Sequence, residues 1–228
     1  MLRLLVSSFG GVGSKCLVKG LLQTADEKIL NQAHTHLRLP PGKDVLDGRK
    51  MIYMFGDPYN AVVSFFNRRK MRTRAHGFDG RGGGGDPFWV VKHCRNIGGK
   101  HAAMNPNWEL MDYLKNGVDL LEIEQHFDNW VQARTEYPIL FLRYETMWDH
   151  LQDIYNFVGL PQSDIARFPA QQPRGSSWQE QPESLKLGLA KMYGALHKRI
   201  MNAADVWIAG NTVRPHDDAM ATSAQPRL

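Results

Sequence analysis

The stretch LRLLVSSFGGVGSK, residues 2–15, decides the fold of this chain. Its apolar first part, residues 2–7, has the length and composition of a buried strand. The glycines that follow predict a sharp turn, and residues 14–22 have the spacing of a helix. A strand, a glycine-rich turn and a helix are therefore predicted in direct succession.

A turn of this kind can bind phosphate. Glycines let the backbone curl so that successive N–H groups point inward, and the following helix adds the positive end of its dipole. The turn lacks the Walker A signature, because that motif places Lys directly after its last Gly and this chain has Ser14 there. ATP hydrolysis is therefore disfavoured. A tight strand-to-helix corner without a ligand is the alternative interpretation of the turn alone.

The rest of the chain alternates helices with apolar strands. Further strands are predicted at residues 29–36, 50–55 and 139–143. Helices are predicted at residues 58–70, 108–114, 120–134, 147–158 and 182–207. This alternation predicts an α/β fold in three layers, with a central, mostly parallel sheet flanked by helices.

One domain is expected over residues 1–210, because a core of this size suits a single domain. Residues 71–107 are rich in glycine and predicted to be irregular, and loops of that length are often functional. Residues 211–228 show no periodicity and are predicted to be a flexible tail.

Composition excludes several classes of protein. The chain is 43% hydrophobic and 22% charged, which is typical of globular proteins rather than disordered or collagen-like ones. Its two cysteines are too few for a disulfide framework, and no carboxylate or Cys/His cluster has the spacing of metal ligands. No apolar run approaches the ~18 residues of a membrane span, and no signal-peptide pattern is present. We expect a cytoplasmic protein without a metal.

The net charge of +5 is concentrated in one loop. Residues 68–82 hold six basic side chains against one acidic side chain. The basic ones are Arg68, Arg69, Lys70, Arg72, Arg74 and Arg81. A compact patch favours a compact anionic ligand over nucleic acid, which requires basic residues spread along a face. A solvated surface loop is the alternative.

Six further segments follow one another in an informative order. They are AHTHLRLP (33–40), IYMFGDPYNAVVS (52–64), YLKNG (113–117), HFDNW (126–130), ILFLRYE (139–145) and FVGLP (157–161). Together with the first turn they resemble the sulfotransferases that use 3′-phosphoadenosine 5′-phosphosulfate (PAPS). The resemblance covers roughly residues 3–178. It implies a P-loop NTPase-like fold, transfer of a sulfuryl group to a hydroxyl or amine, and 3′-phosphoadenosine 5′-phosphate (PAP) as the product.

The family loop that holds the 5′-phosphosulfate, typically Pro-Lys-Ser-Gly-Thr-Thr-Trp, falls on GGVGSKC in this chain. The cofactor-binding residues implied are Gly10, Gly11, Val12, Gly13, Ser14, Lys15 and Cys16. Gly13 and Ser14 match the family pattern. The family lysine that contacts the transferring group falls on Gly11, so we expect Lys15 to supply the charge instead.

The resemblance also implies a general base. The family segment Lys-Thr-His-Leu-Pro matches residues 34–37, which makes His36 the candidate catalytic base. A strand-end histidine bonded to a carbonyl is the alternative interpretation. His126 is a candidate for contact with the acceptor, although its spacing from Trp130 equally fits a packing pair on a helix. His34 and His126 are the next candidates for the base.

The nucleotide end of the family site is matched in part. Ser64 is retained from the 3′-phosphate motif, but the family arginine of that motif is Gly56 here, and Arg68 or Arg69 are candidates to replace it. Tyr144 falls on a family tyrosine near the adenine. Arg174 and Gly175 match a late segment that closes over the 3′-phosphate.

These matches predict a sulfotransferase with in-line transfer and a histidine base. The acceptor is left open among small molecules, saccharides and peptides, and the oligomeric state is not predicted. Two alternatives remain at this point. One is a P-loop nucleotide kinase, and the other is a catalytically weakened descendant of the fold that only binds a nucleotide.

Overall fold

The computed structural model describes residues 3–24, 34–75 and 88–210, with the backbone alone at residues 69–75. Within these residues a five-stranded sheet runs in the order β2-β1-β3-β4-β5. The strands are β1 (Leu4–Ser7), β2 (His34–Thr35), β3 (Lys50–Phe55), β4 (Ile139–Arg143) and β5 (Val206–Ala209). The first four are parallel, and β5 is antiparallel to β4.

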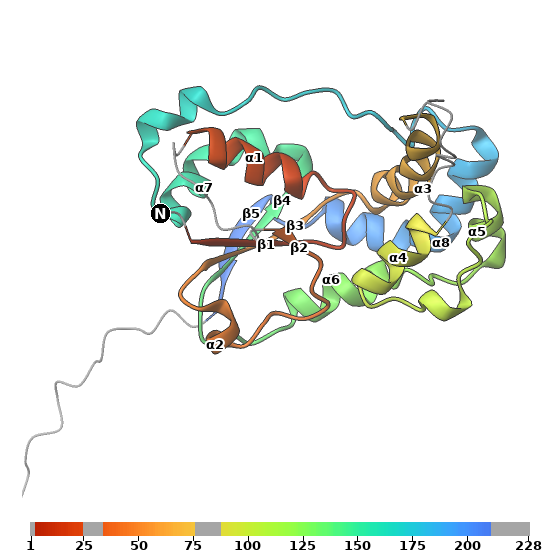
Figure 1. The fold of residues 1–228 in the computed structure, drawn as a ribbon, viewed down its shortest axis with the longest axis horizontal. Coiled ribbons are helices and arrows are strands. Elements are labelled where there is room, and N and C mark those ends of the chain that lie inside the picture. The colour runs from red at the N-terminus through yellow and green to blue at the C-terminus, as the bar shows by residue number, and fades with distance from the viewer. Residues whose placement is uncertain (1–2, 25–33, 76–87, 211–228) are drawn as a thin grey trace, which may run out of the picture.

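Helices cover both faces of the sheet (Figure 1). Helices α1 (Ser14–Thr24) and α7 (Leu151–Val158) lie over one face, and α2 (Lys43–Leu46) and α6 (Ile123–Val131) lie on the other. Helices α3 (Pro58–Ala75), α4 (Trp89–Asn96), α5 (Leu110–Asn116) and α8 (Glu183–Met201) gather toward the carboxyl ends of the parallel strands. The predicted three-layer α/β fold is confirmed.

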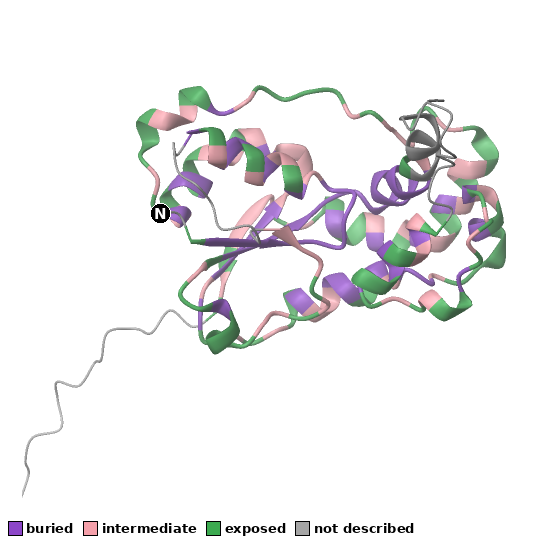
Figure 2. Cartoon of the chain, in the orientation of Figure 1, coloured by how far each residue is buried: buried purple, intermediate pink, exposed green. Residues whose placement is uncertain are grey.

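The central strands are buried on both faces (Figure 2). Every residue of β1 is buried, as are residues 51–55 of β3 and 139–142 of β4. Such continuous apolar runs are typical of parallel strands covered on both sides. Ser7 pairs with Thr35 on one side and with Tyr53 on the other, so three strands end at nearly the same level. The segments that follow them therefore meet at one edge of the sheet.

The segment predicted to be irregular, residues 71–107, contains regular structure. Helix α3 continues to Ala75, α4 spans Trp89–Asn96, and a short 3-10 helix, η1, spans His101–Ala103. Val90, His93, Cys94 and Ile97 are buried at helical spacing, which holds α4 against the body of the protein. The prediction was wrong here because the glycine run before α4 hid this short amphipathic pattern; residues 76–87 lie outside the described residues.

The helix predicted over residues 182–207 was also too long. Helix α8 ends at Met201, and the chain then forms strand β5. Trp207 lies in that strand and stacks on Phe141 of β4, with ring centroids 4.7 Å apart. A short apolar run reads equally well as the end of a helix or as a strand, and only pairing with β4 separates the two.

Smaller differences concern element ends. Strands β3 and β4 have the predicted bounds, whereas the helix predicted from residue 147 begins as a 3-10 helix, η2 (Tyr144–His150), and becomes α-helical at Leu151. A further 3-10 helix, η3, spans Gln162–Arg167. Most of the predicted strand at 29–36 and the whole predicted tail at 211–228 lie outside the described residues. In the part of the chain that is described, no helix is both long and apolar enough to cross a membrane.

Candidate functional site

The turn after β1 depends on its glycines. Gly10, Gly11 and Gly13 have φ values of +92°, +69° and +70°, a region that other residues rarely adopt. A Cβ atom on Gly11 would lie 2.7 Å from Cα of Ala61, and one on Gly13 would lie 2.1 Å from the ring of Tyr144. The turn is thus packed against its neighbours, and it delivers the chain to the N-terminus of α1 at Ser14.

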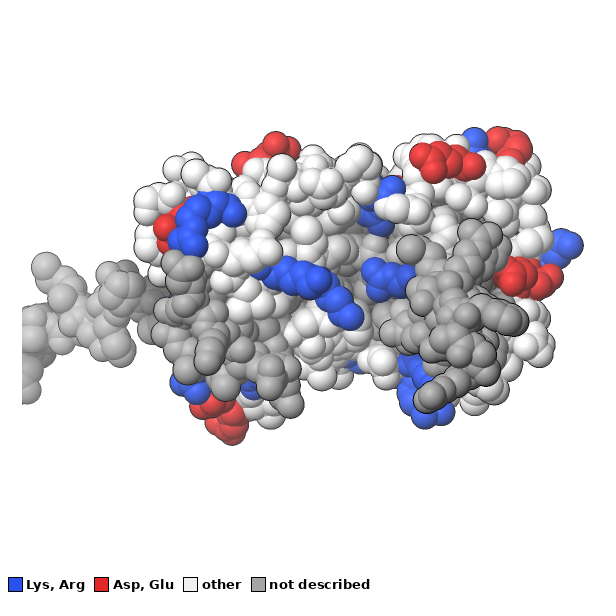
Figure 3. Space-filling view, turned by 45° about the horizontal axis from the view of Figure 1, so that its top comes forward, with Lys and Arg blue, Asp and Glu red and all other residues white. Residues whose placement is uncertain are grey.

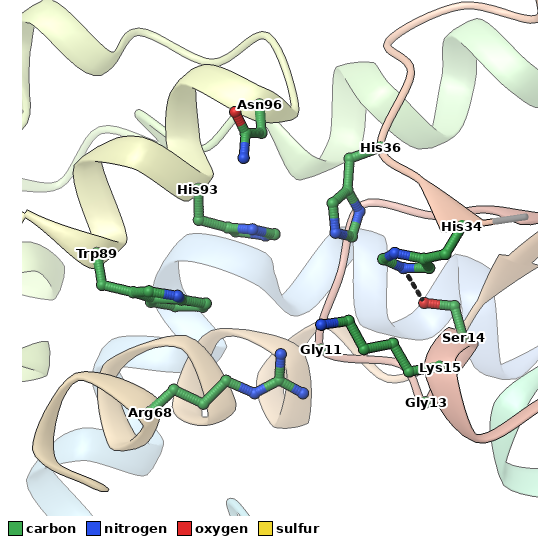
Figure 4. Close-up of a pocket in the computed structure, with 10 residues that line it drawn as sticks. All are labelled: Gly11, Gly13, Ser14, Lys15, His34, His36, Arg68, Trp89, His93 and Asn96. Carbon is green, nitrogen blue, oxygen red and sulfur yellow. Dashed lines mark hydrogen bonds between the residues drawn. The ribbon is translucent and has the colours of Figure 1, made fainter. Parts of the chain in front are cut away.

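A pocket of about 260 Å³ opens at this turn (Figure 4). The turn, α1, the segment around β2, α3 and α4 all contribute to it. The residues that line it are Gly11, Gly13, Ser14, Lys15, His34, His36, Arg68, Trp89, His93 and Asn96. Two of these are cationic, and none of the described lining residues is a carboxylate. A small anionic group is the ligand that such a lining favours.

The distribution of surface charge also favours an anionic ligand. On the face shown in Figure 3, several Lys and Arg side chains lie across the middle of the molecule, where no described Asp or Glu side chain is seen, and others lie at the periphery beside the acidic ones. Lys15, exposed on the first turn of α1, points into the pocket, and so does Arg68 from α3 (Figure 4). The guanidinium of Arg68 lies 5.9 Å from the ring centroid of Trp89. Two helices far apart in the sequence therefore bring their cations to one place.

His36 has the hydrogen bonding of a base. Its Nδ1 lies 2.7 Å from the carbonyl oxygen of Ser8, and because a carbonyl only accepts, Nδ1 carries the proton. Nε2 of the neutral ring therefore keeps its lone pair. Burial lowers the pKa of His36, and the nearby Lys15 and Arg68 lower it further. The ring is consequently neutral and able to accept a proton at neutral pH.

His34 lies beside His36, with ring centroids 4.6 Å apart, but has a different kind of partner. Its Nε2 is 2.8 Å from Oγ of Ser14, the first residue of α1. Oγ of Ser14 is in turn 3.1 Å from Oγ of Ser8. Burial, assisted by neighbouring positive charge, lowers the pKa of His34 to about 4, so this ring is also neutral at neutral pH.

Helix α4 completes the pocket with residues that the sequence analysis did not single out. His93 donates from Nε2 to the carbonyl oxygen of Phe9 at 3.1 Å, and burial lowers its pKa to about 3. Its ring meets that of His36 edge to face at 4.9 Å and lies parallel to that of Trp89 at 5.2 Å. Asn96 lies one turn further along α4. The helical spacing of residues 90, 93, 94 and 97 was the signal that could have found this helix.

The three histidines do not form a metal site. Across residues 3–24, 34–75 and 88–210, no group of three or more His, Cys, Asp or Glu side chains is arranged to hold a metal ion. Instead, His36 and His93 each donate a hydrogen bond from one ring nitrogen to a backbone carbonyl oxygen. The cluster is therefore a set of neutral, oriented imidazoles.

Several predicted cofactor residues lie around the turn rather than in the pocket. Arg174 donates to the carbonyl oxygen of Gly11 at 2.8 Å and lies 4.8 Å from the ring centroid of Tyr144, which itself covers Gly13. The remaining predicted residues that do not line this pocket are Gly10, Val12, Cys16, Ser64 and Gly175. Of these, Val12 is fully buried and Ser64 is 8% exposed.

The position that replaces the family arginine, Gly56, faces a carboxylate. A Cβ atom on Gly56 would lie 2.9 Å from Oε2 of Glu145. Glu145 accepts the N–H of Asp57 at 3.1 Å and pairs with Arg174 at 3.4 Å, and burial raises its pKa. Arg68 lies in the pocket at the turn, and the side chain of Arg69 lies outside the described residues.

His126, the candidate for contact with the acceptor, does not line the pocket. The side chain is completely buried, and its Nδ1 lies 3.0 Å from the hydroxyl of Tyr53 in the core. Its ring stacks with that of Tyr53, with ring centroids 5.8 Å apart. The spacing from Trp130 reflects packing, because Trp130 is also fully buried and stacks on the same tyrosine.

Comparison with known proteins gives one family. The model of the sulfotransferase domain matches residues 18–186, which is most of the chain but begins after the glycine turn. No curated protein and no solved structure gives a significant match.

Proposed function

The chain belongs to the sulfotransferase domain family, and from this we propose that it transfers a sulfuryl group from PAPS to a hydroxyl or amine through the base His36. Transferase activity on a sulfuryl group follows from the family match. The donor, the base and the in-line geometry are the proposed part. The observation that carries them is the position of His36, with its Nε2 unprotonated, in the same pocket as the glycine turn and Lys15.

The residues at the turn suit the phosphosulfate end of PAPS. Two left-handed glycines, Gly11 and Gly13, line the pocket beside the N-terminus of an 11-residue helix, and a turn of this kind would offer backbone N–H groups and a positive dipole end to the anion. Ser14 adds a hydroxyl, and Lys15 and Arg68 add two cations. When bound, the donor supplies an activated sulfuryl group on a phosphate leaving group.

Lys15 and Arg68 would stabilise charge during transfer. In a transfer of this type, charge spreads over the peripheral and bridging oxygens, and fixed donors stabilise it without rearrangement. Lys15 comes from the end of α1 that holds the phosphate, and Arg68 comes from the opposite wall on α3. This arrangement supports the proposal that the two cations together stabilise the charge that one loop lysine stabilises in the family pattern.

His36 would accept the proton of the acceptor. The carbonyl of Ser8 holds the ring in one orientation and one tautomer, so that Nε2 is the nitrogen able to accept. His93 meets that ring edge to face and stacks in turn on Trp89, and this wall would keep an acceptor close to in-line geometry. The lining is polar apart from Trp89, so an acceptor with polar groups around its reacting hydroxyl or amine fits better than a long apolar alcohol.

A nucleotide kinase fits these residues less well. A kinase of this fold needs carboxylates that hold Mg²⁺ next to the phosphates. None of the described residues lining the pocket is Asp or Glu. The polar residues that are present are donors or neutral imidazoles, which suit an anion held directly by the protein.

Acceptor screening with radiolabelled PAPS tests the proposal. The purified chain is incubated with labelled PAPS and panels of phenols, saccharides, amines and peptides, with and without Mg²⁺. We expect labelled product from one panel, unaffected by a chelator. Label transferred from γ-labelled ATP instead, and none from PAPS, would contradict the proposal.

Binding of the product nucleotide gives a second measurement. A ligand that binds only the folded state stabilises it by mass action, by about 2.7 kcal/mol at a hundred times its Kd. For a chain of this length that raises the melting temperature by roughly 5–10 °C. PAP should produce this shift and ATP with Mg²⁺ should produce less. The opposite order would remove PAPS as the donor.

A further inference from the structure

The hydroxyl of Ser14 has two polar neighbours and one proton. Its oxygen lies 3.1 Å from Oγ of Ser8 and 2.8 Å from Nε2 of His34 (Figure 4). Ser14 is 4% exposed, and it lines the pocket at the start of α1. The direction of its proton therefore depends on how these neighbours use theirs.

Either hydroxyl could donate in the hydrogen bond between Ser8 and Ser14, and burial favours donation from Ser8. Oγ of Ser8 already accepts the N–H of Gly10 at 3.2 Å, and the residue is fully buried. A buried hydroxyl that donates to nothing costs free energy. Donation from Ser8 to Ser14 avoids that cost, and it leaves the proton of Ser14 for either His34 or a ligand.

His34 decides between these two outcomes. If Nε2 of His34 is unprotonated, Ser14 donates to it and offers the pocket no proton. If Nε2 carries the proton, His34 donates to Ser14, and the hydroxyl of Ser14 is released to donate into the pocket. Without an anion, the nearby charges of Lys15 and Arg68 disfavour a hydroxyl proton that points into the pocket. A bound anion reverses that preference.

We propose that His34 is a positioning residue that changes from acceptor to donor when an anion occupies the pocket, and so turns the hydroxyl of Ser14 toward the ligand. This inference rests on the proposed function, because the anion concerned is the phosphosulfate end of the donor. In the change, the ring gives up the proton on Nδ1 to solvent and takes one from solvent on Nε2, while Ser14 keeps its own proton. The net charge of the ring stays the same.

The neighbouring imidazoles lack this freedom. His36 and His93 donate to the carbonyl oxygens of Ser8 and Phe9, which cannot donate in return. Their tautomers are therefore locked whether or not the pocket is filled. The partner of His34 is a hydroxyl, which both donates and accepts. The three rings thus provide one switchable residue and two internal controls.

Nitrogen NMR of the full chain tests the inference directly. The ¹⁵N shifts of histidine separate the two neutral tautomers, so spectra are recorded at pH 7.5 without ligand, with saturating PAP and with saturating inorganic pyrophosphate. We expect His34 to change from the Nδ1–H form to the Nε2–H form with either anion, while His36 and His93 keep their forms. A His34 tautomer that stays the same at saturation would overturn the proposal.

Variants separate positioning from simple support of the fold. His34→Gln places an amide donor near the position of Nε2, whereas His34→Leu removes the donor. We expect His34→Leu to weaken PAP binding about tenfold, the usual effect of one hydrogen bond, and His34→Gln to restore most of that loss. In a Ser14→Ala background, His34→Leu should have little further effect. Equal losses in both backgrounds would show that His34 acts independently of Ser14 and contradict the proposal.

The two anions separate this inference from the proposed function. If pyrophosphate changes the tautomer of His34 and PAP does not bind, the donor assignment fails while the role of His34 stands. If PAP binds and PAPS supports transfer but the tautomer of His34 is unchanged, the role of His34 fails alone. Binding of neither anion overturns both. Should His34→Leu fail to fold, the spectra of the unmodified chain still decide the question.

Discussion

The two ends of the candidate site differ in how much of their polar chemistry is available to a ligand. At the transfer end, Lys15 and Arg68 point into the pocket, and His36 keeps Nε2 unprotonated. At the nucleotide end, Arg174 already binds the carbonyl of Gly11 and the carboxylate of Glu145. One end presents Lys15 and an unprotonated imidazole nitrogen to the pocket, whereas the arginine at the other end is held by contacts within the protein.

Under the proposed function, this difference indicates where a family site can change while its chemistry is kept. A base must be oriented and unprotonated before it can act, and backbone carbonyls near β1 provide that orientation for His36 and His93. The cation at the transfer end can come from another element, because charge stabilisation depends on where the charge lies rather than on which residue carries it.

Loss of the base should have the largest effect. In His36→Ala, transfer should fall by ~10²–10⁴, the usual contribution of a general base, while PAP binding changes little. The measurements are labelled transfer and calorimetric binding. His101→Ala, which changes a histidine outside the pocket lining, is the matched control. Near-normal transfer by His36→Ala would remove His36 from the mechanism and leave His34 as the next candidate.

The pH dependence sharpens the same prediction. Transfer should fall as pH falls through the pKa of His36, because the protonated ring cannot accept a proton. Burial, together with Lys15 and Arg68, lowers that pKa, so the fall in kcat/KM should occur below the pH at which an ordinary histidine titrates. His36→Ala should lack this step.

Loss of the cation on α1 should have the next largest effect. Lys15→Ala should lower kcat by about 10², the usual effect of removing one charge-stabilising donor, and should lower PAP affinity less. Lys19→Ala is the matched control, because Lys19 is also exposed one turn later on the same helix but does not line the pocket. Rates within about twofold of each other for the two variants would place Lys15 outside the site.

A change at the nucleotide end should have the smallest effect. Glu145→Gln keeps an acceptor for the N–H of Asp57 but removes the negative charge beside Gly56, so PAP should bind about fivefold more tightly with kcat little changed. The gain should grow as pH rises, because the carboxyl, whose pKa is raised by burial, then becomes fully ionised in the unmodified chain. Weaker PAP binding would contradict this prediction and show that Glu145 contributes to nucleotide binding by positioning Arg174.

Much of the framework could be predicted because it depends on local patterns. Strands β3 and β4 were predicted with their observed bounds, since each is a compact apolar run ended by a clear change in composition. The glycine turn was predicted from another local signal, because its positive φ values need glycine. Helix α4 and strand β5 were missed because a short apolar run does not reveal its own partner.

The sequence by itself determined the layered α/β fold and the turn at residues 10–13, because these follow from periodicity and glycine geometry. The candidacy of Ser14, Lys15 and His36 also came from the sequence, through the resemblance of its ordered motifs to the sulfotransferases. The tertiary structure decided which side chains share the pocket. Only the folded chain brings Arg68, Trp89 and His93 to the turn, buries His126 in the core and places Glu145 beside Gly56. The physical reason is that these contacts join residues far apart along the chain, and their positions depend on how α3, α4 and η2 pack at the end of the sheet.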